Sequence, residues 1–137
     1  MRDIKFRGLS KVTGKLVYGN LIQTSKYKDG HIHCWIQEKS LLGLGVLSTP
    51  TTRFVDVHSE SVGQFTGLQD RNGVDIYEGD IVHWESASLS MICDWSDEDC
   101  AFALSGVKSK CGAMMNQDFM LNYRVIGNIH ENPELLK

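Results

Sequence analysis

Four carboxylates lie close together in the middle of the chain, at Asp70, Asp75, Glu78 and Asp80. Carboxylates grouped in this way can bind Ca²⁺ or Mg²⁺, or act as a general acid and base. The spacing does not fit a calcium-binding loop, because Gly73 is the fourth residue from Asp70 and that loop needs glycine at position six. Each carboxylate also suits a turn or a solvated strand end. We therefore favour a structural role, with a small metal-dependent hydrolase as an alternative.

His31 and His33 are two residues apart, so on a strand their side chains project from the same face. They can share a metal ion if a third ligand, such as His58 or His83, approaches in three dimensions. The spacing does not require that approach. We expect an exposed polar face here, and we predict neither a metal nor a cofactor.

The four cysteines include no C-x-x-C pair, which excludes a zinc ribbon or a thioredoxin-like motif. Cys34, Cys93, Cys100 and Cys111 are expected to be buried, reduced thiols. Gly8 to Lys15 looks like a phosphate loop but has five residues between its glycines where the motif has four. No Ser-His-Asp or Cys-His-Asn set can be assigned. These observations favour a protein without enzymatic activity.

Basic residues next to aromatic ones are the pattern that most suggests a ligand. Such residues can stack on and neutralise single-stranded nucleic acid. The simpler explanation, which we favour, is that strands alternate buried aromatic with exposed charged residues. The net charge of -3 provides no overall attraction to a polyanion. The candidate binding residues are Lys5, Arg7, Lys26, Tyr27, Lys28, Arg53, Tyr123 and Arg124.

The first half of the chain reads as a series of strands. Ile4 to Arg7 alternates apolar and basic residues, and the Thr13-Gly14 turn separates it from a second strand, Lys15 to Gln23. A third strand is expected over His31 to Glu38. Leu41 to Thr52 contains Gly43, Gly45 and Pro50, which favours a loop or an irregular strand. Alternation resumes over Arg53 to Val57.

The Asp70 to Asp75 segment predicts a particular turn. A two-residue Asn72-Gly73 hairpin would place Asp70 opposite Asp75, and like charges in that position are destabilising. A type I turn that starts at Asp70, with Gly73 in the left-handed conformation, pairs Leu68 with Ile76 and separates the carboxylates. We predict this second arrangement.

The second half predicts more strands and few helical turns. After a turn at Glu78 to Asp80 come a strand, a hairpin with an acidic tip at Ser96 to Asp99, a short helical stretch and a closing strand. Asn132 is expected to cap a final turn that begins at Pro133, and Leu135 and Leu136 must then pack on the body or on a neighbouring subunit. The strands are expected over 81–84, 89–95, 100–104 and 124–129, and the helical stretch within 114–123.

The whole chain fits one mainly β domain. Its 137 residues can bury a core without disulfides, and no apolar run approaches the ~20 residues of a membrane span. The N-terminal residues lack the features of a secretory signal, so we expect a cytoplasmic protein. We predict small antiparallel or mixed sheets, or a partly open barrel with SH3-like character in the C-terminal half, with few short helical turns.

Three segments together resemble the YopX family: Met1 to Gly8, Val62 to Val82 and Val125 to Leu136. The resemblance implies a mostly β fold over residues 1–137, an origin in a phage or prophage and a cytoplasmic location in the bacterial host, but no activity. Segments 25–52 and 86–122 do not share it, and loops that vary over a fixed scaffold often carry specificity. The residues that carry the resemblance include Thr66, Gly67, Leu68, Asp70, Asn72, Gly73, Ile76, Tyr77, Glu78, Gly79, Asp80, Ile81, Val82, Asn132 and Pro133.

The sequence therefore favours a non-enzymatic accessory protein that binds another macromolecule, most simply a protein. Self-association through sheet edges or the C-terminal turn is a further expectation. The alternatives are a nucleic-acid-binding module in phage replication or regulation, and the small metal-dependent hydrolase. We expect no membrane partner.

Overall fold

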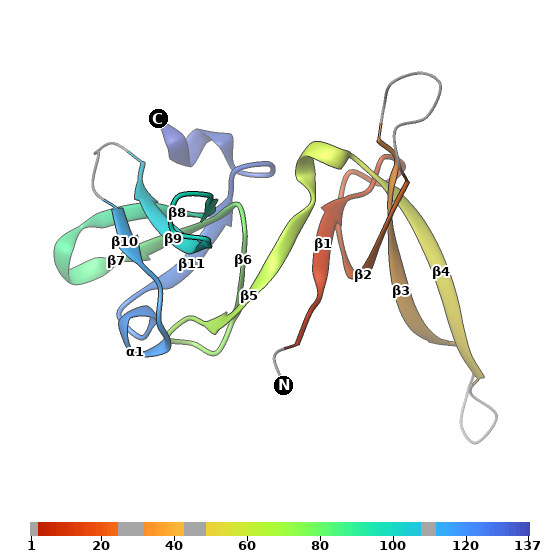
Figure 1. The fold of residues 1–137 in the computed structure, drawn as a ribbon, viewed down its shortest axis with the longest axis horizontal. Coiled ribbons are helices and arrows are strands. Elements are labelled where there is room, and N and C mark those ends of the chain that lie inside the picture. The colour runs from red at the N-terminus through yellow and green to blue at the C-terminus, as the bar shows by residue number, and fades with distance from the viewer. Residues whose placement is uncertain (1–2, 25–31, 43–48, 108–111) are drawn as a thin grey trace. The chain divides into compact units, whose positions relative to one another are not determined.

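The structure is a computed structural model that describes residues 3–24, 32–42, 49–107 and 112–137. Strands make up 55% of it and helical turns 13%, which confirms a mainly β fold. Its two sheets are antiparallel and not closed into a barrel, so separate sheets are the arrangement found. The chain divides into an N-terminal unit, Ile4–Gln64, and a C-terminal unit whose continuous part is Phe65–Lys137. Figure 1 shows both units.

The N-terminal unit is built on antiparallel strands that follow one another along the chain (Figure 1). In the sheet order β4-β3-β2-β1-β5-β6, strand β5 begins in this unit and continues into the C-terminal unit, where it pairs with β6. The predicted N-terminal hairpin is confirmed by the pairing of Arg7 with Tyr18. The elements are β1 (Phe6–Leu9), β2 (Leu16–Gln23), β3 (Cys34–Leu42), β4 (Thr49–Val57), η2 (Ser59–Ser61) and β5 (Gly63–Gln69).

The third and fourth strands differ from the prediction: β3 begins at Cys34 and continues to Leu42, whereas the prediction was His31 to Glu38, and β4 begins at Thr49 instead of Arg53. Leu41 to Thr52 was predicted to form a loop or an irregular strand, and both ends of this segment are strand, because Leu41 pairs with Pro50 and Leu42 with Thr49. Backbone hydrogen bonds between β3 and β4 extend both strands through residues whose local propensity did not predict a strand. Pro50 is tolerated because β4 is an edge strand. Residues 43–48 lie outside the described part.

One face of the N-terminal sheet carries a small core. Its buried members are Val17, Cys34, Ile36 and Val57, with Phe6, Leu21, Val55 and Val62 packed against them. Gly8 is needed because a Cβ there would lie 2.9 Å from Cγ2 of Val57. Strand β1 thus packs closely on the end of β4, where Ser10 also pairs with Val57.

The C-terminal unit contains a five-stranded antiparallel sheet in the order β10-β9-β8-β7-β11 (Figure 1). The predicted hairpin with an acidic tip is confirmed by the pairing of Ser96 with Ala101. The predicted helical stretch is the single turn α1, whose N-terminus is capped by the Asn116 side chain at 2.9 Å from the Phe119 N–H. The elements are β6 (Asp75–Tyr77), β7 (Asp80–Trp84), η3 (Glu85–Ala87), β8 (Leu89–Ser96), β9 (Ala101–Gly106), β10 (Gly112–Met114), α1 (Gln117–Met120), β11 (Arg124–Asn128) and η4 (Pro133–Leu136).

The core of this unit surrounds Tyr123. Its ring contacts Trp84, at 5.6 Å between ring centroids, and Phe119, at 5.2 Å. Burial of several apolar side chains here supplies the main stabilisation of the unit, at roughly 25 cal/mol per Å² of apolar surface. The buried members are Ile76, Val82, Met91, Cys93, Leu104, Met120 and Tyr123.

The turn between β5 and β6 is built around the buried Asp70 carboxylate. Oδ1 accepts hydrogen bonds from the backbone N–H groups of Asn72, at 2.7 Å, and Val74, at 2.9 Å. Oδ2 accepts one from Val125 at the start of β11, at 2.9 Å. One side chain thereby closes its own turn and fixes that turn to a strand 55 residues away.

The backbone of the turn confirms the predicted type. The Gly73 N–H donates to the Asp70 carbonyl at 3.0 Å, and Gly73 has a φ of 78°, which favours glycine. Asp75 lies opposite Gln69 and accepts a hydrogen bond from its amide at 3.0 Å. Asp70 and Asp75 are therefore not opposite each other, as predicted.

The Thr66-Gly67 pair interrupts the ladder between β5 and β6. The register shifts between Phe65 and Gln69, and Gly67 has a φ of 87°. The Thr66 hydroxyl donates to the Ile76 carbonyl at 2.9 Å and accepts from the Leu68 N–H at 3.2 Å. A hydroxyl thus replaces ladder hydrogen bonds that the bulge removes.

The C-terminal turn differs from the prediction at Asn132. This residue occupies the N-cap position of η4, but its side chain makes no capping hydrogen bond. Its Oδ1 instead accepts a hydrogen bond from the Asn128 N–H at 3.3 Å. A Cβ on Gly127 would lie only 2.5 Å from this oxygen, so the contact requires glycine. The side chain therefore holds η4 against the end of β11.

Replacement of the Asp70 carboxylate should destabilise the protein. In Asp70→Asn, the amide NH₂ takes the place of one acceptor oxygen and leaves a buried N–H without its charged partner, which costs about 2–3 kcal/mol. Urea unfolding followed by circular dichroism measures this loss. The exposed Asp118 in the same unit provides the control, since Asp118→Asn should stay within about 0.5 kcal/mol of wild type. Equal stability of the two variants would contradict the role assigned to Asp70.

Candidate functional site

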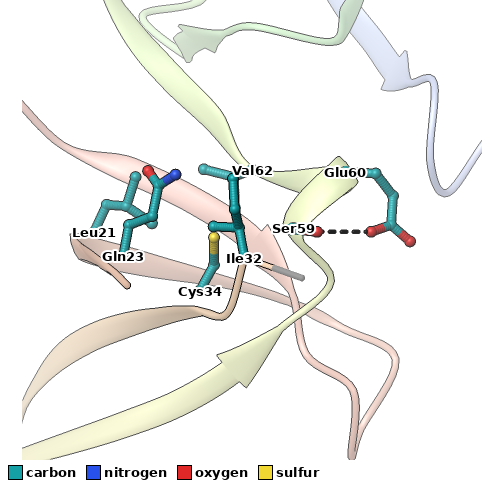
Figure 2. A pocket seen from close by; sticks show the side chains of 7 residues that line it. All are labelled: Leu21, Gln23, Ile32, Cys34, Ser59, Glu60 and Val62. Atoms are coloured by element: carbon teal, nitrogen blue, oxygen red, sulfur yellow. Dashed lines mark hydrogen bonds between the residues drawn. The ribbon is translucent and has the colours of Figure 1, made fainter. Parts of the chain in front are cut away.

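An open pocket of about 390 Å³ lies in the N-terminal unit (Figure 2). Most of its lining is apolar, with polar side chains at either end. The lining residues are Leu21, Gln23, Ile32, Cys34, Ser59, Glu60 and Val62.

Two structural features position this lining. The register of β2 and β3 pairs Gln23 with Cys34 and Leu21 with Ile36. The four side chains therefore lie on one face of the sheet. The 3-10 turn η2 brings Ser59 and Glu60 to the same place, and Val62 follows it.

The buried Ser61 hydroxyl holds η2 in position. It donates to the His58 carbonyl at 2.7 Å and accepts from the Leu9 N–H at 2.7 Å. The Ser61 hydroxyl therefore connects η2 to β1. This connection holds the part of the pocket wall that η2 forms.

The chemistry of the pocket suits binding more than catalysis. Burial raises the pKa of the Cys34 thiol above its ordinary value of 9.0, an effect that nearby Lys11 opposes and Asp56 reinforces. At neutral pH this sulfur is a protonated, weakly polar group and not a nucleophilic thiolate. The Ser59 hydroxyl donates to Oε2 of Glu60 at 3.3 Å, and Oε1 of Glu60 lies 3.5 Å from Nδ1 of His58.

The opposite face of the same sheet exposes apolar side chains. Tyr18 is 49% exposed, Ile22 40% and Phe54 57%. Ile22 lies opposite Trp35 in the ladder, and the Trp35 ring stacks on His33 at 6.0 Å between centroids. This face gives the unit a second surface capable of apolar contact.

The structure places the predicted basic and aromatic residues that it describes in different surroundings. Arg7 and Tyr123 are buried, so neither presents a surface to a ligand. Arg53 forms an ion pair with Glu38 at 2.7 Å, and Arg124 one with Glu85 at 3.1 Å. Lys5 is partly buried in the sequence before β1, and Lys26, Tyr27 and Lys28 lie outside the described residues.

Two of the carboxylates that first suggested chemistry, Asp70 and Asp80, accept hydrogen bonds from the backbone. Asp70 holds its turn as described, and buried Asp80 accepts a hydrogen bond from the Tyr77 N–H at 2.7 Å. Gly79 between them has a φ of 84° and bridges Cys93 and Ile129 through its own N–H and carbonyl. Within the described ranges, no three His, Cys, Asp or Glu residues are grouped as metal ligands would be.

The histidine and cysteine predictions have mixed outcomes. His31 and Cys111 lie outside the described residues. Cys34 and Cys93 are buried free thiols, as predicted, but Cys100 is exposed. It sits in the turn between β8 and β9 with a φ of 51°, where the chain reverses at the surface.

Sequence reasoning missed the pocket and one ion cluster. Pocket residues such as Leu21 and Ser59 belong to no motif, and the β2–β3 register and the turn η2 bring them near Cys34. The cluster consists of Arg71 and Arg124, which contact different oxygens of Glu85 at 3.2 and 3.1 Å. No signal in the sequence pairs these three residues.

Comparison with known families identifies the chain. The YopX protein family matches residues 5–137, which is nearly the whole sequence. The protein belongs to the YopX family. No curated protein matches it. No helix in the described residues is long and apolar enough to cross a membrane.

A solved structure is similar to this protein along the whole chain. Protein EF1440 from Enterococcus faecalis is 26% identical in sequence, each chain is covered over 100% of its length, and the TM-score is 0.66. The likeness therefore extends over both units of this YopX protein. The single family domain over residues 1–137 stays a prediction.

Cys34 should react more slowly than Cys100 with iodoacetamide at pH 8. Cys34 is buried and its raised pKa lowers the thiolate fraction, whereas Cys100 is exposed. Peptide mass spectrometry after timed labelling should show at least a tenfold difference in rate. The Cys34 rate should continue to increase above pH 9, because its thiolate forms in that range. Equal rates at pH 8 in the folded protein would contradict this environment for Cys34.

Proposed function

We propose that this YopX protein is a non-enzymatic protein-interaction module, encoded by a phage or prophage and active in the bacterial cytoplasm. The observation that carries the proposal is the open, mainly apolar pocket of the N-terminal unit. Apolar concave surfaces with a few polar groups are the usual places for a bound side chain or ligand.

The apolar lining favours binding of a macromolecule. Ile32 remains 38% exposed beside the pocket, and leaving apolar groups in water forgoes stabilisation that a partner can supply. The exposed side chains on the other face of the sheet extend the surface available to that partner. The long edge strand β4 gives a second copy of the chain another route to pair.

Capture from a bacterial lysate that contains the gene tests the proposal. A protein held by the tagged wild type after nuclease treatment should be reduced at least tenfold by Ser59→Trp, which places a large ring over the pocket. Tenfold corresponds to about 1.4 kcal/mol, the scale of one good interface contact. Ser59 is exposed, so the fold should tolerate the change.

Two control variants make this test specific. Val12→Ser alters an exposed apolar residue outside the pocket and should leave capture unchanged. Phe54→Ser alters the opposite face of the sheet and reports whether that face contributes. Equal capture by wild type and Ser59→Trp would contradict the pocket as the interaction site.

The Arg71–Glu85–Arg124 cluster supports nucleic-acid binding as a second candidate function. Two guanidinium groups share one carboxylate, so the cluster has a net positive charge. The Arg71 N–H donates to the Tyr123 carbonyl at 3.0 Å, which keeps the two arginine backbones side by side. Each guanidinium retains N–H donors that suit phosphate oxygens.

Anisotropy of fluorescein-labelled oligo-dT at low salt tests this second candidate. The double variant Arg71→Ala/Arg124→Ala should raise Kd about tenfold, because it removes two charge-assisted contacts. Glu85→Gln should instead tighten binding, since it removes a negative charge, although it weakens a structural ion cluster. Lys15→Ala serves as the control, because Lys15 is exposed in the other unit. Weaker binding by Glu85→Gln, or no binding by wild type, would contradict the hypothesis.

A further inference from the structure

The centre of the pocket suits a single apolar side chain. Cys34, at 4% exposure, lies beneath Ile32 and Val62, and Leu21 closes one side. Figure 2 shows Cys34, Ile32 and Val62 close together, with Leu21 and Gln23 to one side of them and Glu60 to the other. Contact with such a lining removes apolar surface from water on both partners, which favours an aliphatic occupant.

The open shape of the pocket favours an occupant that belongs to a longer chain. This pocket is open to one side, so an occupant the size of one side chain keeps its remaining atoms outside. A protein segment meets this condition, because its backbone continues past the pocket in both directions.

The Gln23 end of the pocket suits a peptide backbone. Gln23 is the last residue of β2 and is exposed. Its side-chain amide offers both a donor and an acceptor, which are the two groups that a peptide bond requires. The backbone of a segment that crosses the pocket can therefore form hydrogen bonds with this uncharged amide.

The Glu60 end selects the charge of the neighbouring residue. Its side chain is 74% exposed and carries the one charge among the described lining residues. Figure 2 shows the carboxylate extending away from the apolar side chains, so a cation can reach it without entering the pocket. An acidic residue at the same place would be repelled.

We propose that the pocket binds a segment of a partner protein in which an aliphatic side chain lies next to Lys or Arg. The aliphatic group fills the space above Cys34, and the cation pairs with Glu60. This inference rests on the proposed protein-interaction function and names the chemistry of its partner.

Selection from a displayed library of random heptapeptides tests the inference. The full-length wild-type protein should enrich peptides with Leu, Ile, Val or Met within two residues of Lys or Arg. Glu60→Lys should enrich the same aliphatic residues next to Asp or Glu. A synthetic peptide selected by wild type should bind Glu60→Lys about fivefold more weakly, the size of an exposed ion pair. Glu60→Gln should give an intermediate Kd.

The outcomes separate this inference from the proposed function. Peptides that are lost with Ser59→Trp but show no basic preference, and bind Glu60→Lys as tightly as wild type, would overturn the charge selection and leave the protein-interaction function standing. Absence of any enriched peptide that depends on the pocket would overturn the inference, while lysate capture still decides the proposed function. Enrichment of acidic segments by wild type would also overturn it.

Discussion

The structure of the C-terminal unit depends on one buried carboxylate. Asp70 accepts backbone hydrogen bonds from its own turn and from Val125, so strands far apart in sequence meet at a single side chain. A buried charge is costly unless its hydrogen-bonding capacity is used. Here three N–H groups surround it, and each of them would otherwise need another acceptor. These hydrogen bonds therefore connect the turn to the start of β11, which directly follows Tyr123.

The residues that carry the YopX resemblance stabilise the backbone of this unit. Gly67, Gly73 and Gly79 adopt positive φ values that side chains disfavour, and Thr66 and Asp80 satisfy backbone groups beside them. The polar groups of Thr66 and Asp80 are used in hydrogen bonds to the backbone and are therefore poorly placed to contact a ligand. The candidate pocket lies in the other unit and uses mostly residues outside this set. Such a division allows the binding surface to vary while the scaffold is retained.

Sequence reasoning performed best where the signal was local. The Asp70 turn, the hairpin tip at Ser96 to Asp99 and the positive φ at Gly73 all follow from the preferences of adjacent residues. It failed where distant pairing decided the outcome: β3 and β4 continue through Leu41 and Pro50 because each supplies the other's hydrogen bonds. The capping role of Asn132 failed for the same reason, since contact with Gly127 and Asn128 overrides the local preference. The pocket could not be predicted, because its lining comes together through the β2–β3 register and the position of η2 and not through a motif.

The same chemistry that weakens an enzymatic interpretation strengthens a binding one. A catalytic cysteine needs a stabilised thiolate, and burial of Cys34 favours the opposite protonation state. A pocket for an aliphatic group gains from that neutral sulfur, because a charge beneath the occupant would require costly desolvation. Glu60, in contrast, lies in water at the rim, where the proposed pairing with a cation requires little desolvation. The proposal thus assigns affinity to the apolar centre and selectivity to the solvated edge, which are formed by different residues of one small site.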